Sequence, residues 1–388
     1  MDFVLDDEHP LNPFPHYERM RESAPVFHDE QSGSWHVFGY EDVQRVLTEH
    51  AAFSSKMVPD DPSETGQLFA ASLISTDPPR HRQLRSLVTQ AFTPKAVDAL
   101  APRISALADE MLDVIVSTGR ADLIEALAYP LPVIVIAELM GIPAEDRNRF
   151  KQWSDVIVSQ TRTGAENVDH RATNREMTEY FLAMIEQRRS RPGNDLISSL
   201  LAAEIEGQKL SVAELLGFCS LLLVAGNETT TNLIGNAVLS FTEAPETIER
   251  LAADPSLLPQ AIEEVLRYRS PVQSMYRVTA TDTTLGSRPI PAGSPVVAWI
   301  GSANRDERQF ERPERFDIQR SPNRHLAFGQ GIHFCLGAPL ARLEARIALG
   351  AVLSRLPGLT LAAGSRLERM ESTIIYGLKE IPVSWQAA

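Results

Sequence analysis

The spacing of apolar residues along the chain predicts a mainly helical protein. Over residues 40–270, apolar positions recur every three or four residues, as on one face of a helix. The pattern is interrupted at prolines, which end helices. Those prolines are Pro94, Pro130, Pro143, Pro192 and Pro271. Residues 57–75 show neither helical nor strand periodicity, so we expect a long loop there, of a kind that often shapes a binding site.

Shorter segments have the composition of β-strands. Within residues 26–38, two apolar runs flank a turn at Ser32 and Gly33 and predict a hairpin. Residues 276–300 are rich in β-branched side chains broken by glycine and proline, which predicts antiparallel strands, and short strands are expected in 359–384. The run 338–355 predicts one strong helix before them.

The N-terminal region and the lack of internal divisions complete the predicted organisation. Residues 1–25 contain four prolines and little periodicity, so we expect an extended arm. No internal repeat is visible, and no linker rich in glycine or serine divides the halves. We therefore expect residues 1–388 to form a single domain, mainly α with a minor antiparallel β region.

Composition narrows the class of protein. The 37 basic and 51 acidic side chains give a net charge of −14, which disfavours a broad nucleic-acid binder. The acidic N-terminus lacks a signal-peptide pattern, and no stretch has the ~18 uninterrupted apolar residues of a membrane-spanning helix. The two cysteines, Cys219 and Cys335, exclude a disulfide framework and a four-cysteine zinc site. We expect a cytoplasmic monomer with no nucleic-acid or membrane partner.

Cys335 lies in a glycine-rich segment, AFGQGIHFCLGAPLARLE, that spans residues 327–344. The glycines allow a tight loop, and Pro339 suits the first turn of the following helix. The N-terminus of a helix favours a thiolate, the form of cysteine that binds metals or acts as a nucleophile. A lone cysteine is more often inert packing, and Cys219, inside an apolar run, is expected to be such a residue.

A second motif, AGNETTTN, follows an apolar run that begins with a capping-box signature at Ser211 and Glu214. Consecutive threonines are poor helix formers, so the sequence gives up local stability there. Glu228 is an acid in an otherwise apolar stretch. These residues can form a functional site, or Glu228 can simply be a solvated acid beside threonines whose hydroxyls bond back to their own helix. The positions that share one helical face are Leu222, Ala225, Gly226 and Thr229.

The segment around Cys335 resembles the haem-binding loop of the cytochrome P-450 family, the haem-thiolate monooxygenases. The resemblance extends in order over most of the chain and is closest to the bacterial soluble type. It implies the cytochrome P-450 fold, with haem b between the distal helix and the cysteine loop. It also implies that the Cys335 thiolate is the axial ligand of the iron and favours O–O cleavage. The matching residues are Phe328, Gly329, Gly331, His333, Cys335 and Gly337.

For AGNETTTN, the resemblance implies catalytic roles. Thr229 would hydrogen-bond the dioxygen, and Glu228, with water, would deliver protons. Ala225 and Gly226 would leave room beside the haem. An intact acid and alcohol pair favours a dioxygen-using monooxygenase over a peroxide-driven enzyme or an isomerase, and over a haem-based binding or sensor protein. A helical protein without a cofactor is the remaining alternative.

The resemblance assigns two further groups of charged residues. In EEVLR, Glu264 and Arg267 are three residues apart and can pair; the family's pattern adds Arg315, in FERPERFD, to a buried structural network. The second group would bind the haem propionates, although the spacing within DPPRHRQLR is also common on solvated helices. Its members are His81, Arg85, Arg277 and His333.

The implied substrate pocket is chiefly apolar, with Gln273 as its one polar handle, so we expect a small-to-medium hydrophobic substrate such as a steroid, terpenoid, fatty acid or macrolide. The expected reaction is hydroxylation or epoxidation. Electrons are expected from NAD(P)H through a reductase and a ferredoxin. The pocket residues are Phe69, Leu73, Ile74, Leu222, Val272, Gln273, Met275, Ile374 and Ile375. A basic patch for the ferredoxin would include some of Arg80, Arg82, Lys95, Arg324, Arg342 and Arg346.

Overall fold

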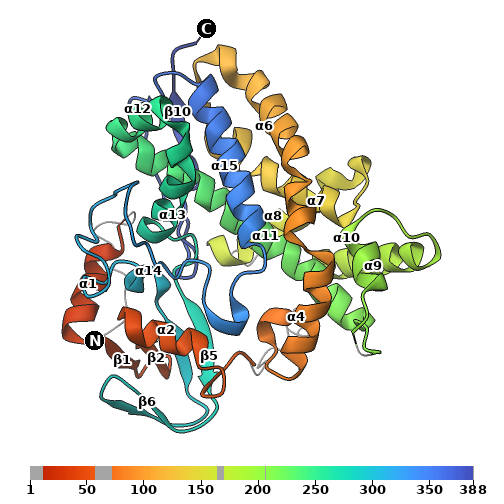
Figure 1. The fold of residues 1–388 in the computed structure, drawn as a ribbon, viewed down its shortest axis with the longest axis vertical. Coiled ribbons are helices and arrows are strands. Elements are labelled where there is room, and N and C mark those ends of the chain that lie inside the picture. The colour runs from red at the N-terminus through yellow and green to blue at the C-terminus, as the bar shows by residue number, and fades with distance from the viewer. Residues whose placement is uncertain (1–11, 57–71, 164–169, 206, 388) are drawn as a thin grey trace. The chain divides into compact units, whose positions relative to one another are not determined.

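The computed structural model describes residues 12–56, 72–163, 170–205 and 207–387 (Figure 1). Two compact units emerge from it: unit 1 holds residues 1–54, 103–129 and 229–388, and unit 2 holds residues 55–102 and 130–228. Helices predominate in both units, which confirms the mainly helical class. The long helix α11 (Val212–Glu243) begins in unit 2 and ends in unit 1. The single domain expected from the sequence stays a prediction.

Unit 1 contains a five-stranded sheet that includes the predicted hairpin. Trp35 pairs with His28 across the hairpin, as the turn at Ser32 and Gly33 predicted. The pairing of β2 with β8 is parallel, so the sheet is mixed; the strands lie far apart in sequence, as a parallel pair requires. In pairing order the strands are β1 (Val26–Asp29), β2 (Ser34–Val37), β8 (Pro295–Ala298), β5 (Met275–Thr279) and β3 (Phe53–Ser54).

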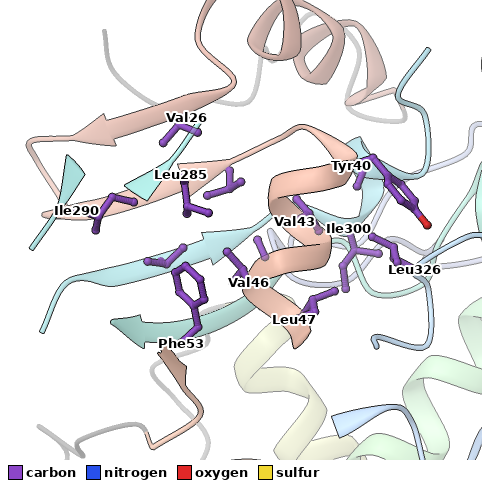
Figure 2. Packing of buried hydrophobic residues seen from close by; sticks show 14 of the residues in the cluster. Val26, Tyr40, Val43, Val46, Leu47, Phe53, Leu285, Ile290, Ile300 and Leu326 are labelled. Atoms are coloured by element: carbon purple, nitrogen blue, oxygen red, sulfur yellow. The ribbon is translucent and has the colours of Figure 1, made fainter. Parts of the chain in front are cut away.

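Helix α2 (Tyr40–Thr48) packs against this sheet through one apolar face (Figure 2). Val43, Val46 and Leu47 recur at helical spacing and are almost fully buried. They meet strand residues such as Phe53 and Leu285 in one hydrophobic cluster. This cluster fixes the position of α2 and of the residues at its end.

The N-terminal region differs from the extended arm expected from its prolines. Residues Phe14–Ser23 form helix α1. Pro13 precedes the helix and Pro15 lies in its first turn, where backbone N–H groups have no partner within the helix, so proline costs nothing there. Tyr17 is buried, and its ring lies 5.5 Å from that of Trp299. Residues 1–11 of the expected arm lie outside the described residues.

The remaining elements of unit 1 include helix α15, whose bounds, Ala338–Arg355, are those predicted. It packs on α12 (Pro245–Ala253) and α13 (Leu258–Tyr268) (Figure 1). The strands expected in 276–300 and 359–384 are confirmed. The other elements are most of α6 (Ala101–Ile115), α14 (Ile300–Ala303), the pair β6 (Thr283–Leu285) and β7 (Arg288–Ile290), and the sheet of β4 (Arg120–Asp122), β10 (Pro382–Ser384) and β9 (Thr360–Leu361).

Unit 2 is built from helices whose ends lie close to the prolines that were predicted to interrupt the helical pattern. Pro94 and Pro130 each begin a helix, because proline is favoured in the first turn. Of the loop expected over residues 57–75, the described part contains a short 3-10 helix, Leu73–Ser75. The helices are α4 (Arg80–Ala91), α5 (Pro94–Asp98), α7 (Pro130–Met140), α8 (Arg147–Thr163), α9 (His170–Ser190) and α10 (Leu196–Ala202).

Among the described residues, α11 is long and apolar enough to cross a membrane. The sequence criterion of uninterrupted apolar residues did not select it, because polar side chains punctuate the run. Half of its most apolar window is buried inside the structure, and the core helix of a soluble protein meets the same test. The finding is therefore weak evidence for a membrane span.

The buried ion-pair network is confirmed in two of its members and wrong in the third. Glu264 and Arg267 are 0% exposed and form two parallel hydrogen bonds of 2.8 Å. The third member is Arg320, whose Nε lies 3.1 Å from Glu264 Oε1. Arg315 instead contributes its backbone carbonyl, which accepts from Arg267 at 3.0 Å, while its own side chain is exposed. The turns of this irregular segment, which the sequence pattern does not encode, bring Arg320 inward.

This difference predicts unequal effects of two arginine truncations in the same loop. Arg320→Ala should lower the free energy of unfolding by about 3 kcal/mol, because it removes a cation from a buried carboxylate. Arg315→Ala, the matched control, should change it by less than about 0.5 kcal/mol, because an exposed side chain is lost and the backbone carbonyl is kept. Urea denaturation of the haem-loaded protein measures both. Equal losses, or a larger loss for Arg315→Ala, would contradict the assignment.

Candidate active site

The loop that carries Cys335 is closed by its own backbone. The Cys335 N–H donates to the Phe328 carbonyl at 2.8 Å, and the Phe334 N–H donates to the Gly331 carbonyl at 3.1 Å. Gly331 has a φ of +73°, and a Cβ there would lie 3.1 Å from the Leu47 carbonyl oxygen at the end of α2. Glycine is therefore favoured at this position by both conformation and space. The predicted tight loop is confirmed.

The two cysteines have different surroundings. Cys335 is partly exposed and lies just before α15, whose N-cap is Gly337 and whose first turn contains Pro339. Cys219 is buried within α11, and burial raises the pKa of its thiol to about 12. Neither of them, both within the described chain, forms a disulfide. A thiolate is favoured beside a helix N-terminus and disfavoured in an apolar interior, so Cys335 is the cysteine suited to binding a metal.

The start of α11 is fixed by the predicted capping box and by an ion pair within unit 2. The Ser211 N–H donates to Glu214 Oε2 at 2.8 Å, and the Glu214 N–H donates back to Ser211 Oγ at 3.2 Å. Arg80, on α4, donates through Nε and Nη2 to the same carboxylate, each at 2.7 Å. Burial alone would raise the pKa of Glu214, but these hydrogen bonds lower it. The pair connects α4, which carries His81 and Arg85, to the start of α11.

The predicted face of α11 is incompletely covered by the rest of the structure. Ala225 is exposed, and Leu222, Gly226 and Thr229 are partly exposed. The neighbouring positions Leu223, Asn227, Glu228 and Thr230 are all buried. Leu221 and Val224, which are not part of this face, are partly exposed as well. The predicted face is an incompletely covered strip at which a bound group can lie.

The structure shows a packing reason for Gly226, while its expected role beside the haem stays a prediction. A Cβ at this position would lie 2.9 Å from Ile136 Cδ1 on α7, so the missing side chain makes room for a neighbouring helix. At the next position, Asn227 Nδ2 donates to Ser154 Oγ on α8 at 2.6 Å. Packing within unit 2 therefore accounts for both residues, and neither contact was signalled by periodicity.

The four residues expected at the haem propionates fall in different units. His81 and Arg85 lie one turn apart on α4 in unit 2, with His81 buried and Arg85 partly exposed. Arg277, on β5 of unit 1, is buried, and its Nη1 donates to the Tyr276 carbonyl at 2.7 Å. His333 ends the 3-10 helix Gly331–His333 of the cysteine loop. The shared role of the four residues stays a prediction.

Two of the predicted pocket stretches lie side by side in unit 1. Val272 and Ile375 form an antiparallel bridge, and the Gln273 N–H donates to the Ile374 carbonyl at 2.7 Å. Val272 and Met275 are partly exposed, and Ile374 is 36% exposed, so apolar surface is available there. In unit 2, Leu73 is buried and Ile74 exposed. Phe69 lies outside the described residues.

Gln273 does not serve as the expected polar handle. Its side chain is buried, and both ends of its amide are engaged: the Tyr17 hydroxyl donates to Oε1 at 3.0 Å, and Nε2 donates to the Ser270 carbonyl at 2.6 Å. Glutamine satisfies a donor and an acceptor at once, which explains its place in the interior. The remaining linings in unit 1 are apolar.

One titratable residue was missed from the sequence. Glu344, on α15, is almost fully buried; burial raises its pKa to about 8, although a hydrogen bond with the Thr230 side chain partly opposes the shift. Thr230 is the residue after Thr229 on α11. The signal was present in LARLEARIAL, where an acid falls between two positions that are apolar and buried, Leu343 and Ala345.

A cysteine loop at the start of one helix, together with a long apolar helix that carries an acid and a threonine, defines a haem-thiolate protein. The chain belongs to the cytochrome P-450 family, whose model matches residues 7–383. It is a monooxygenase, an oxidoreductase that incorporates molecular oxygen, and the cytochrome P-450 fold is confirmed by solved structures.

Two similar proteins, one of them in two crystal structures, illustrate this membership. Cytochrome P-450 YjiB of Bacillus subtilis is 46% identical over 96% of this chain and 93% of its own length. The crystal structure of substrate-free CYP109E1 from Bacillus megaterium matches with a TM-score of 0.94 and 45% identity over 98% of this chain and all of that one. The same enzyme in complex with testosterone matches with a TM-score of 0.89 and 46% identity over 97% and 99% of the two chains.

The residues present fit the haem that the family implies. Cys335 supplies a partly exposed sulfur at a helix N-terminus, and α11 has the incompletely covered strip. His81, Arg85, Arg277 and His333 supply donors for carboxylates. Each of these residues is of a type that a haem-thiolate site uses.

The raised pKa of Glu344 predicts a pH-dependent loss of stability. Because the folded-state pKa of about 8 exceeds the ordinary value of 4.5, folding favours the protonated acid, and its contribution is lost as pH rises between these values. Glu344→Gln removes this dependence, so the variant should gain stability relative to the unaltered protein from about pH 5 to pH 8. Urea unfolding across this range measures the difference.

The matched control is Glu249→Gln, at an exposed position of α12. The free energy of unfolding of this variant should change with pH in the same way as that of the unaltered protein over the same range. A Glu344→Gln curve that also runs parallel would show that the buried carboxyl is not protonated on folding.

Proposed function

We propose that the protein inserts one oxygen atom of dioxygen into a small-to-medium hydrophobic substrate, by hydroxylation or epoxidation, and that Cys335 is the residue that would hold the iron of haem b. The single observation that supports this most is the closed loop that holds Cys335 before α15. The haem, when bound through a thiolate, supplies the electron-rich iron that favours O–O cleavage. The chain's own residues hold it, exclude water and move protons.

Proton delivery is proposed for Glu228 and Thr229. Glu228 is buried on α11, and Thr229, the next residue, is partly exposed on the strip that can face a bound group. A hydroxyl both accepts and donates a hydrogen bond, so Thr229 can hold the dioxygen and pass on a proton that Glu228, with water, supplies. Fixed proton donors matter because an apolar pocket contains little water to serve instead.

Charge pairing is proposed to fix the haem at its edge. His81, Arg85, Arg277 and His333 would donate to the two propionates, because charge-assisted hydrogen bonds are stronger than neutral ones. Arg277 is buried, and a carboxylate stabilises a guanidinium in such a place more than it would at the surface.

The substrate is proposed to be hydrophobic and of steroid, terpenoid, fatty-acid or macrolide size. Val272, Met275, Ile374 and Ile375 supply apolar surface in unit 1, and Leu73, Ile74 and Leu222 do so in unit 2. With Gln273 engaged internally, the described lining offers little to bind a polar group. The complex of CYP109E1 with testosterone favours a steroid as the first compound to test.

Electrons are proposed to come from NAD(P)H through a reductase and a ferredoxin, in the cytoplasm. Of the six basic residues predicted for the ferredoxin, Arg80 is bonded to Glu214 and Arg342 to Glu263, so these two are already engaged. Arg324 and Arg346 of unit 1 and Arg82 and Lys95 of unit 2 are exposed. The exposed four are the better candidates for meeting acidic side chains of a partner.

Turnover with NAD(P)H, ferredoxin and reductase tests the proposed reaction. A hydrophobic compound that displaces water from the iron, tried first among steroids, should yield an oxygenated product labelled from isotopic dioxygen. Thr229→Ala should lower the ratio of product formed to dioxygen consumed by roughly an order of magnitude, because a positioned proton donor is lost.

The control is Thr242→Ala, on the same helix, where the hydroxyl bonds back to the Val238 carbonyl at 2.9 Å. This variant should keep the ratio of the unaltered protein. Product formed with peroxide alone, or a ratio unchanged in Thr229→Ala, would overturn the proposed use of dioxygen by this pair.

A further inference from the structure

Three side chains from separate parts of unit 1 meet behind the cysteine loop. Glu263 lies on α13 and Arg342 on α15, and His325 precedes the loop in sequence. Arg342 donates through Nε and Nη2 to the two oxygens of Glu263, at 2.6 and 2.8 Å. His325 Nε2 lies 3.0 Å from Glu263 Oε2. Glu263 thus accepts a bidentate pair of hydrogen bonds from Arg342 and a further hydrogen bond from His325.

The hydrogen bonds define the charges in this group. The Ala327 N–H donates to His325 Nδ1 at 3.3 Å, so the ring proton is on Nε2 and points to Glu263. Burial alone would raise the pKa of Glu263, but the bonds from Arg342 and His325 hold it at about 2. Glu263 is therefore a carboxylate at neutral pH and a firm anchor for the guanidinium.

Arg342 connects this anchor to the cysteine loop. Its guanidinium carbon lies 4.4 Å from the centre of the Phe328 ring, within the range of a cation–π contact. The carbonyl of the same Phe328 accepts the N–H of Cys335 at 2.8 Å. Bonding to Glu263, opposed by burial, raises the pKa of Arg342, and the charge of Cys335 adds to this. The cation is thus electrostatically coupled to the cysteine as well as packed against the loop.

We propose that Glu263 is a positioning residue that holds Arg342 against Phe328, and that the fixed positive charge raises the reduction potential of the haem. This inference rests on the proposed role of Cys335 as the iron ligand. Adding an electron makes the iron–thiolate group more negative, so a nearby cation stabilises the reduced form. The carboxylate of Glu263 partly cancels the field of the cation, so the effect depends on the guanidinium being held on the loop side of the pair, against Phe328.

The midpoint potential of the haem-loaded protein, measured by spectroelectrochemical titration, tests the proposal. Arg342→Gln should shift the potential downward, because the cation is removed. Arg342→Lys should give a smaller downward shift, because the charge is kept but the two parallel bonds are lost. Arg346→Gln, which removes an exposed charge one turn further along α15, should leave the potential close to that of the unaltered protein.

A double-mutant cycle separates positioning from simple charge. If Glu263 acts through Arg342, the shift caused by Arg342→Gln should be smaller in a Glu263→Gln background than in the unaltered protein. If the contact between α13 and α15 were merely structural, the two substitutions would change the free energy of unfolding, but their effects on the midpoint potential would not depend on each other. An unchanged potential in Arg342→Gln, an equal shift in Arg346→Gln, or an additive cycle would each overturn the proposal. If Arg342→Gln does not fold, the midpoint potentials of Arg342→Lys and Glu263→Gln are measured instead. A potential unchanged in Arg342→Lys would then overturn the proposal.

The ferrous carbonyl spectrum keeps the two proposals apart. A red-shifted Soret band in the unaltered protein, together with potentials that do not respond to Arg342, overturns the positioning role alone. Absence of that band from the unaltered protein overturns thiolate ligation by Cys335, and the positioning role with it.

Discussion

The hydrogen bond from the Cys335 N–H to the Phe328 carbonyl closes the loop on which the site depends. A loop this tight favours glycine at position 331, where the backbone is left-handed and the end of α2 leaves little space for a side chain. Helix α2 is in turn fixed by its apolar face against the mixed sheet. Helix α15 begins directly after the loop and packs on α13. The position of one sulfur atom therefore depends on the hydrophobic core of unit 1.

Three of the buried or half-buried acids described in unit 1 are accommodated either by ion pairing or by protonation. Glu264 is fully buried and is satisfied by Arg267 and Arg320, which gives the loop after α14 its shape. Glu263 is paired with Arg342 and His325, and this pairing reaches the cysteine loop through Phe328. Glu344 has no arginine bonded to it within the described residues and is protonated instead, since burial raises its pKa to about 8. Because a buried charge is costly, each acid needs its own solution.

Features that depend on neighbouring residues in the chain could be predicted from the amino-acid sequence. The bounds of α15, the capping box of α11, the hairpin and the glycine loop are all of this kind. Helix α1 was missed because four prolines suggested an irregular arm, whereas two of them lie at the helix start. Arg315 was expected where the structure has Arg320, and Gln273 was expected to contact substrate, because partners distant in sequence decide which side chains turn inward. Periodicity carries no information about those partners.

The ferrous carbonyl spectrum of cysteine variants tests the central claim most directly. The unaltered protein and Cys219→Ala should show the red-shifted Soret band of a thiolate-bound haem, because Cys219 is a packing residue inside α11. Cys335→Ala should lose that band. Retention of the band in Cys335→Ala would show that Cys335 is not the ligand and would contradict the account.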